Sequence, residues 1–333
     1  MRLALVAVLG SALASFANPC YAANTHPHVA VVIPGLVLDE RDKTLASVLG
    51  LPPWAIYVFR SDDRRGRRIG RGPFERVDAN AGGDRVAAIS GLPANEIASL
   101  GGHLTILDSY GNQLKTFDKI VQAGWATDGK RLALIKGTFM PEAELPDVDS
   151  LLVYDSASGA VKRFRIHPYA TEWIGRDSLL LEYGRGTRIL DLRNGKEAPS
   201  KYHGSLLSPD QSFSLSRGSD ANEPRIWDEL RGVDVTDVIE RAIEGGQVRP
   251  IPAPFWVRDG LHGSLLCIPA CRYSAGRGGA DQPWANCATY LVDVSTQTVR
   301  RRIPGRAIAQ STDQRAVLML HGRRLEFIDV SEP

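Results

Sequence analysis

A short apolar segment that ends in aspartate recurs along this 333-residue chain. In each copy, several strand-forming residues precede the aspartate, and turn-forming residues follow it. The copies are Leu104–Asp108, Leu151–Asp155, Thr187–Asp191, Pro224–Asp228, Thr289–Asp293 and Arg324–Asp329, and Ala55–Phe59 is a weaker seventh with Arg60 in place of aspartate. Short runs of aliphatic and aromatic residues bounded by turn residues are typical of β-strands. The recurrence therefore predicts an all-β protein built from repeated units.

A second recurring segment has an aspartate-centred turn followed by another apolar strand. These turns centre on Asp84, Asp128, Asp177, Asp210, Asp259 and Asp313, with Asp42 as a weaker seventh. An aspartate side chain accepts hydrogen bonds from nearby backbone N–H groups and favours turns, so we interpret these residues as structural. Repeats of roughly 40 to 50 residues, each with several short strands, are the signature of a β-propeller.

The two segments can be assigned to the strands of a propeller blade, which we letter A to D from the centre outward. The aspartate-centred turn fits the A–B hairpin, and the strand that ends in aspartate fits strand C and the C–D turn. The copies predict seven four-stranded blades, or six if the first repeat is an irregular cap. The last repeat lacks a fourth strand, and we expect His28–Ile33 to pair outside Leu325–Asp329 and close the ring. Closure removes exposed sheet edges.

Some of these segments resemble the repeats of the TolB-like and WD40-like (PD40) bacterial propellers. The residues that carry the resemblance are Ser208–Gln211, Thr127–Lys130 and Tyr154–Gly159. The resemblance covers nearly all of the chain as degenerate repeats. It implies the propeller fold and no particular activity.

The N-terminus has the features of a secretory signal peptide. Arg2 supplies a positive charge, Leu3–Phe16 is apolar, and small residues reach Ala22, so we expect cleavage after residue 22 and a single domain over residues 23–333. The apolar run is shorter than the roughly 20 residues that span a bilayer. The residues before Cys20 do not match a lipoprotein signal, so we do not expect a lipid anchor. These features predict a periplasmic or secreted protein.

Cys267, Cys271 and Cys287 remain after that cleavage. An oxidising compartment favours one disulfide and one leftover thiol. We expect the disulfide between Cys271 and Cys287, because it closes the glycine-rich segment between them, and Cys267–Cys287 is the alternative. Three cysteines without a nearby histidine make a poor zinc site.

Four long connections are expected on one face of the disc. In an antiparallel blade the B–C and D–A loops share a face, and Ser90–His103, Thr138–Ser150, Arg217–Glu223 and Cys271–Cys287 all fall between B and C. Long loops on a regular scaffold are where binding usually occurs. The candidate binding residues in these loops are Phe139, Met140, Glu142, Glu144, Asp147, Asp149, Asp220, Glu223 and Trp284. The carboxylates could hold Ca²⁺ or receive a basic partner, and the apolar side chains suit protein recognition.

Two segments point to the other face. Asp234–Gly245 has apolar residues at helical spacing and predicts a short amphipathic helix. Gly66–Gly72 is rich in arginine and is expected at a C–D hairpin turn, either as a solvated basic turn or as a contact for an anion.

The chain lacks the common catalytic motifs. We therefore expect an exported, non-catalytic, monomeric propeller that binds a protein, peptide or other macromolecule through the B–C loop face, without a cofactor. The formal net charge of +2 gives no general nucleic-acid footprint. The alternative is a propeller enzyme, such as a lactonase-like hydrolase or a quinone- or metal-dependent dehydrogenase, with its site at the mouth of the central channel. Converging polar side chains at that mouth would favour the enzyme, and an aliphatic plug would favour the binding module.

Overall fold

The computed structural model describes residues 29–32, 55–61, 63–71, 74–90, 102–138, 147–184, 186–216, 225–243, 249–250, 254–260, 263–271, 287–321 and 324–331. These residues form antiparallel strands and one short helix. The elements are β1 (Val29–Val32), β2 (Ala55–Arg60), β3 (Asp63–Arg71), β4 (Phe74–Ala79), β5 (Arg85–Ser90), β6 (Gly102–Asp108), β7 (Gln113–Trp125), β8 (Arg131–Thr138), β9 (Asp147–Asp155), β10 (Val161–Phe164), β11 (Ala170–Trp173), β12 (Ser178–Tyr183), β13 (Gly186–Asp191), β14 (Lys196–Pro199), β15 (Leu206–Leu207), β16 (Phe213–Ser216), β17 (Arg225–Asp228), β18 (Val233–Asp234), α2 (Thr236–Ala242), β19 (Arg249–Pro250), β20 (Phe255–Asp259), β21 (Gly263–Cys271), β22 (Cys287–Asp293), β23 (Thr298–Pro304), β24 (Arg306–Gln310), β25 (Ala316–His321) and β26 (Arg324–Asp329).

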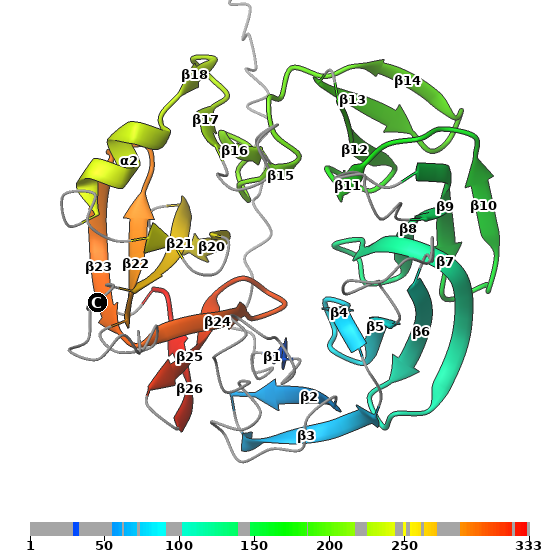
Figure 1. The fold of residues 1–333 in the computed structure, drawn as a ribbon, viewed down its shortest axis with the longest axis horizontal. Coiled ribbons are helices and arrows are strands. Elements are labelled where there is room, and N and C mark those ends of the chain that lie inside the picture. Colours follow the sequence, from blue (N-terminus) through cyan, green and yellow to red (C-terminus); the bar gives the residue numbers. More distant parts are fainter. Residues whose placement is uncertain are drawn as a thin grey trace, which may run out of the picture.

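The sheets stand around a common centre, as Figure 1 shows. In sequence order they are β1-β2-β3, a seven-stranded sheet from β4 to β10, β11 to β14, β15 to β18, β21-β22-β23 with β19 and β20 both on β21, and β24-β25-β26. Strand β7 is 13 residues long and serves two groups of the large sheet, because its first half pairs with β6 and its second half with β8. The arrangement is consistent with the blades of a β-propeller.

The strand assignments made from the repeats are confirmed for six of the copies. Each segment that ends in aspartate is the third strand out from the centre of its group, namely β6, β9, β13, β17, β22 and β26. The aspartate-centred turns join the first strand to the second, for example between β4 and β5 and between β24 and β25. The repeats therefore predicted both the strands and their order within a sheet.

The aspartates have the structural role expected for them. The Asp108 carboxylate accepts hydrogen bonds from the backbone N–H groups of Tyr110 and Asn112, each at 2.8 Å. The Asp155 carboxylate accepts from Ala157 and Ser158 in the same way, and the bond from Ser158 is the main reason that the pKa of Asp155 lies below its ordinary value. The aspartates close turns and are not gathered into a site.

The turn after β22 differs from its counterparts in one residue. Gly159, Gly195 and Gly232 take the fourth position after their aspartates with φ of +74°, +71° and +67°, and Gln297 takes that position after Asp293 with φ of +56°. A residue with a side chain in this left-handed region costs about 1 kcal/mol. We expect Gln297→Gly to raise the free energy of unfolding by roughly 0.5 to 1 kcal/mol, and the matched change Gly195→Gln to lower it by a similar amount. Urea unfolding of both variants checks this, and equal shifts of the same sign would contradict it.

Apolar clusters join the first sheet to both of its neighbours in the ring, the second sheet and the last sheet. Alternate residues of β2 face opposite neighbours: Ile56 and Val58 belong to a cluster with Val86 of β5, whereas Tyr57 and Phe59 pack with Leu318 of β25. Because the first sheet packs against both the second and the last, residues from the two ends of the chain share one buried cluster.

The expected position of the N-terminal strand is wrong. Strand β1 does not pair with β26; it pairs antiparallel with β2, with Val29 opposite Arg60 and Val32 opposite Tyr57. Its four residues are all apolar, which suits a strand near the ring centre between neighbouring sheets, whereas β26 alternates exposed and half-buried residues as an outer strand does. Among the described residues the last sheet has three strands.

Two related predictions for the first repeat are also wrong. The segment at Ala55–Phe59 is the middle strand of its sheet, and Gly66–Gly72 lies in strand β3 for as far as it is described, not at a hairpin turn. A Cβ at Gly66 would come within 2.3 Å of the Phe59 ring. The glycine is therefore explained by close packing against β2, which the sequence pattern alone did not distinguish from a turn.

The predicted amphipathic helix is confirmed as α2. Ile239 is fully buried, and Val235 and Ile243 on the same face join a cluster with Phe213 and Leu266. The helix contacts β17 and β23, so it bridges two neighbouring sheets at their outer strands.

Candidate functional site

The four long connections all join the second strand of a group to its third. They lie between β5 and β6, β8 and β9, β16 and β17, and β21 and β22, as expected for B–C loops. The turns that join first to second strands or third to fourth strands are short, such as residues 80–84 and 156–160. Strand order therefore places the four long connections on the same side of the sheets, opposite these short turns.

Most residues proposed for this face lie outside the described residues. These are Phe139, Met140, Glu142, Glu144, Asp220, Glu223 and Trp284. Asp147 and Asp149 are described: both are exposed at the start of β9, alternating with buried Val148 and Ser150. The two carboxylates are therefore strand residues at the edge of the loop and point to solvent.

The cysteines occupy neighbouring strands. Cys271 and Cys287 are directly opposite one another in the β21–β22 register, and Cys267 is a buried free thiol. Burial raises the pKa of the Cys267 thiol, so it is unreactive at neutral pH.

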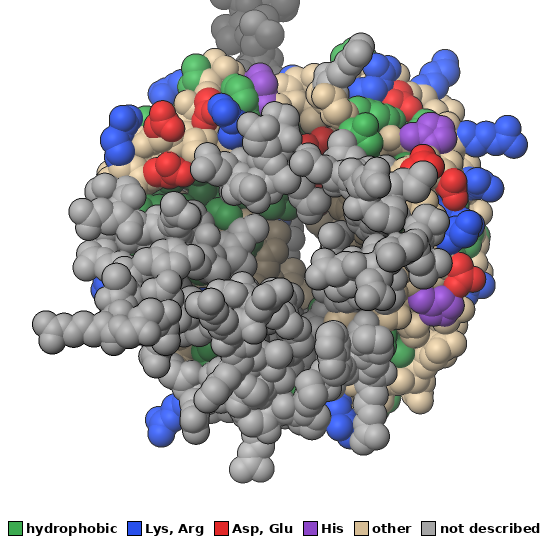
Figure 2. All heavy atoms as spheres, in the orientation of Figure 1, with side chains coloured by type: hydrophobic (Ala, Val, Ile, Leu, Met, Phe, Trp, Pro, Cys, Tyr) green, Lys and Arg blue, Asp and Glu red, His purple; other side chains and the backbone are tan. Residues whose placement is uncertain are grey.

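Two innermost strands, β4 and β11, carry acids that the sequence had not indicated. Figure 2 shows the molecule hollowed at the centre of the ring, and we call this hollow the central channel. Asp78 lies on β4, and its carboxylate accepts a 2.8 Å hydrogen bond from the backbone N–H of Trp125 on β7. Glu172 lies on β11, and the indole N–H of its neighbour Trp173 donates to the Gly124 carbonyl, also on β7, at 2.9 Å. Both strands are therefore tied to the Gly124–Trp125 segment of β7, and the charge of Asp78 acts on Glu172. We call Asp78, Glu172 and Gly124 the acid pair site.

The contact between Trp173 and Gly124 has a counterpart elsewhere in the ring. The indole N–H of Trp256 donates to the Leu206 carbonyl at 3.0 Å, as that of Trp173 does to Gly124. Leu206 therefore occupies the position equivalent to Gly124, and its side chain is 38 % exposed although β15 is an innermost strand. The position is equally open on β7, where a Cβ placed on Gly124 would have no atom within 4 Å.

Both acids are half-buried. Burial raises the pKa of Asp78 to about 6, against the opposing effect of the hydrogen bond from Trp125. Burial, with a further contribution from the charge of Asp78, raises the pKa of Glu172 to about 8. At pH 7 the pair therefore consists of one protonated and one ionised carboxyl, a combination that can donate and accept a proton or bind a cation.

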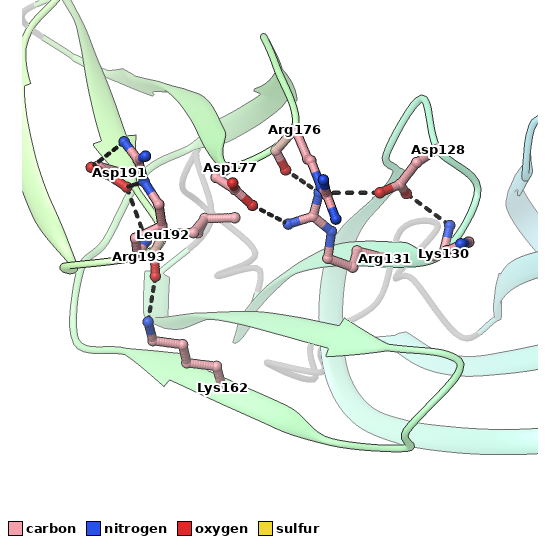
Figure 3. A network of polar contacts seen from close by, with 9 residues as sticks. All are labelled: Asp128, Lys130, Arg131, Lys162, Arg176, Asp177, Asp191, Leu192 and Arg193. Atoms are coloured by element: carbon pink, nitrogen blue, oxygen red, sulfur yellow. Dashed lines mark hydrogen bonds and ion pairs between the residues drawn. The ribbon is translucent and has the colours of Figure 1, made fainter.

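One arginine, Arg131, links the sheet that contains β7 to the sheet that contains β11. Arg131 donates from Nη1 to Asp177 at 2.9 Å and from Nη2 to Asp128 at 3.1 Å (Figure 3). Its guanidinium also lies over the Trp173 ring, 5.1 Å from the ring centroid. It thereby ties the turn after β7 to the turn after β11. The same contact holds Trp173, which donates to Gly124, against β7.

A second buried polar group lies in the sheet from β15 to β18. The Glu229 side chain is 1 % exposed and accepts hydrogen bonds from the Ser214 hydroxyl and from the backbone N–H of His203. Its other oxygen is 2.9 Å from His203 Nδ1, and the imidazole stacks on the Trp227 ring at 4.3 Å between centroids. The serine does not face the imidazole, so this is a structural network rather than a nucleophile with its base.

The acid pair site was missed because isolated acids in short strands look like solvated charges. A signal was present: Asp78 lies between Val77 and Ala79, and Glu172 lies next to Trp173, in strands that precede an aspartate-centred turn, and such strands are innermost. Most carboxylates considered for Ca²⁺ lie outside the described residues. The described residues themselves contain no group of three or more His, Cys, Asp or Glu that could hold a metal.

No family model and no curated protein matches the chain. Solved structures with a similar fold include Kuenenia stuttgartiensis hydrazine synthase, with 10 % identity, a TM-score of 0.46 and coverage of 73 % of this chain and 72 % of that one. The β-propeller domain of Myceliophteria thermophila Cps50 (Swd1) has 12 % identity, a TM-score of 0.35 and coverage of 79 % and 98 %. Pyrococcus horikoshii acylaminoacyl peptidase has 13 % identity, a TM-score of 0.46 and coverage of 84 % and 48 %.

None of the helices among the described residues is long and apolar enough to cross a membrane.

Proposed function

We propose that this chain is an exported, non-catalytic β-propeller of the TolB-like or WD40-like repeat type that binds a protein, peptide or other macromolecule. The observation that carries the proposal is the position of the four long connections, which all join second to third strands. If insertions were tolerated at random, they would be spread over both faces. Their shared class supports a binding face built from these loops.

The proposed architecture is a single seven-bladed domain over residues 23–333, after cleavage of a signal peptide. Dividing the large sheet at β7 separates it into two four-stranded groups, and the other five sheets supply one blade each. Export to the periplasm or the medium rests on the N-terminal pattern of the sequence.

The loop-face proposal is tested by two sets of variants. Phe139→Ala, Met140→Ala and Trp284→Ala, combined, should abolish capture of the partner from envelope extract while the melting temperature stays unchanged. The control is Arg68→Glu on β3, an exposed residue away from these loops. Loss of capture only in the arginine variant, with both proteins folded, would move the site to that strand.

The acid pair site favours a second candidate, a propeller enzyme that works at the central channel. A protonated Glu172 beside an ionised Asp78 is the arrangement needed for general acid and base catalysis. Assays with lactone and ester substrates test it. Turnover that falls at least about 100-fold in Glu172→Gln would support the enzyme, in line with the usual contribution of acid–base catalysis, and equal background rates in both proteins would exclude it for those substrates.

We expect a disulfide between Cys271 and Cys287. The two residues are opposite each other in the register, and Cys267 is a buried free thiol. In the chain-entropy model, closing a loop of about 15 residues stabilises the protein by roughly 3 kcal/mol. Peptide mapping without reductant should recover the Cys271–Cys287 link, and a peptide that links Cys267 to either partner would contradict it.

A further inference from the structure

We propose that the outer edge of the first two sheets binds an anionic lipid surface. The residues that carry the inference are Arg67 and Arg68 on β3, Tyr110 in the turn between β6 and β7, and Leu114 and Lys115 at the start of β7. We call these five residues the basic edge. This goes beyond macromolecule binding by the loop face, and it holds whether or not those loops have a partner.

Strand β3 lies directly against the turn between β6 and β7, at the rim of the disc (Figure 1). The Arg67 guanidinium donates to the Ser109 carbonyl and lies over the Tyr110 ring, 5.3 Å from the ring centroid. A Cβ at Gly111 would come within 2.1 Å of the Ile69 carbonyl oxygen, so the turn packs closely on the strand. The two segments therefore form one continuous surface.

Positive charge dominates this surface. Strand β3 has five arginines and one aspartate in nine residues, and the side chains of Arg67 and Arg68 are exposed. Lys115 on β7 is exposed as well. The acid beside them is Asp108, whose carboxylate accepts hydrogen bonds from the backbone of its own turn. Cations therefore outnumber acids along the edge, which is the condition for attraction to an anionic surface.

Two apolar side chains lie beside these cations. Tyr110 is 79 % exposed, the highest value for a large apolar side chain among the described residues, and Leu114 is 49 % exposed. Charged side chains alone protect an outer strand such as β3 from pairing with another chain, so that role does not account for an exposed tyrosine and leucine. Tyrosine is enriched at membrane–water interfaces, and cations next to apolar side chains are typical of interfacial binding.

The register of β3 favours a broad surface over a peptide in a groove. Arg67 is opposite Val58 of β2, and Arg68 is opposite Tyr57. Val58 packs in the cluster shared with the second sheet, and Tyr57 packs in the cluster shared with the last sheet. The two arginines therefore belong to opposite faces of the outermost strand. A membrane laid against the edge reaches both faces, whereas a peptide in a groove on one face would meet only one arginine.

The experiment is co-sedimentation with sucrose-loaded vesicles. The protein is used as isolated after export, with its N-terminus checked by mass spectrometry. One set of vesicles contains phosphatidylglycerol and phosphatidylcholine in roughly equal parts, and the other contains phosphatidylcholine alone. The protein should bind the anionic vesicles and not the neutral ones. Binding should weaken at high salt, because the screening length falls from about 10 Å at 0.1 M to about 3 Å at 1 M.

Variants of the basic edge test the residues. The double variant Arg67→Gln/Arg68→Gln should weaken binding to the anionic vesicles about 25-fold, because each basic residue near such a surface strengthens binding about fivefold. Arg68→Gln alone should weaken it about fivefold. This single variant keeps the contact between Arg67 and Ser109, so it still tests the inference if the double variant does not fold. Tyr110→Ser and Leu114→Ser, combined, should weaken binding at least about fivefold, because both apolar side chains leave the interface.

Matched controls come from the corresponding turns of other sheets. Arg193 and Arg231 follow Asp191 and Asp228 in their turns and are 75 % and 71 % exposed, and Leu230 is 78 % exposed. The double variant Arg193→Gln/Arg231→Gln and the single variant Leu230→Ser should bind the anionic vesicles as tightly as the native protein does.

A second measurement separates a lipid surface from an acidic protein segment. Fluorescein-labelled hexaglutamate in the same buffer should not bind, and binding that is lost in the arginine variants of β3 would assign the edge to an acidic peptide and overturn the inference. Equal binding of both kinds of vesicle, unchanged binding in the β3 variants, or equal losses in the controls would also overturn it. The loop variants at Phe139, Met140 and Trp284 should bind vesicles normally, so failure of one proposal does not decide the other.

Discussion

Replacement of Glu229 by alanine is expected to lower the free energy of unfolding by about 1 to 3 kcal/mol, the range for leaving a buried hydrogen-bonding group without its partner. The buried Ser214 hydroxyl loses its acceptor, and so does the backbone N–H of the exposed residue His203. The imidazole of His203 also loses the carboxylate that holds it against the Trp227 ring. Each unsatisfied buried donor alone costs about 1 to 3 kcal/mol.

Chemical unfolding of Glu229→Ala measures this loss, and the chain offers a matched control. Asp118 contacts His103 Nδ1 at 2.5 Å, but the two side chains are 76 % and 56 % exposed. Exposed ion pairs contribute about 0 to 1 kcal/mol, so Asp118→Ala should change stability little. Similar losses in both variants would contradict the role given to the buried network.

Replacement of Glu172 by glutamine is expected to stabilise the protein above pH 7 and to flatten the pH dependence of its stability. Burial raises the pKa of Asp78 to about 6 and that of Glu172 to about 8. Between pH 4 and pH 8 the folded state therefore binds more protons than the unfolded state, so stability is full at pH 4 and is lost as pH rises. For each pH unit over which one group stays protonated only in the folded protein, the free energy of unfolding falls by about 1.4 kcal/mol.

Thermal or urea unfolding at pH 5, 7 and 9 checks the sign. The free energy of unfolding of the native protein should fall from pH 5 to pH 9. It should fall less in Glu172→Gln, and least in the double variant that also carries Asp78→Asn. Glu197→Gln is a control outside the acid pair site, since its carboxylate is paired with Arg188 at 2.9 Å near the outer strand β14. A native protein that gains stability between pH 5 and pH 9 would contradict the raised pKa values.

Local patterns in the sequence determined the repeated parts of this protein. A strand that ends in aspartate predicted the third strand of a group, and the structure shows why: the carboxylate of Asp155 caps the turn that follows, a contact made within a few residues. The same locality explains why the helix was predicted, because Val235, Ile239 and Ile243 are at helical spacing on one face. These interactions join residues that are close in the sequence, so a local pattern of residue types can predict them.

Only the tertiary structure decided which separate segments meet. The apolar residues of β1 predicted a strand but not its partner, and pairing with β2 rather than β26 depends on how the first sheet fits between its neighbours. The acid pair site arises in the same way. Asp78 and Glu172 are almost a hundred residues apart in the sequence, and the charge of one acts on the other because two tryptophans tie their strands to β7. The shift in their pKa values comes from burial in the assembled ring, which no local pattern of residues expresses.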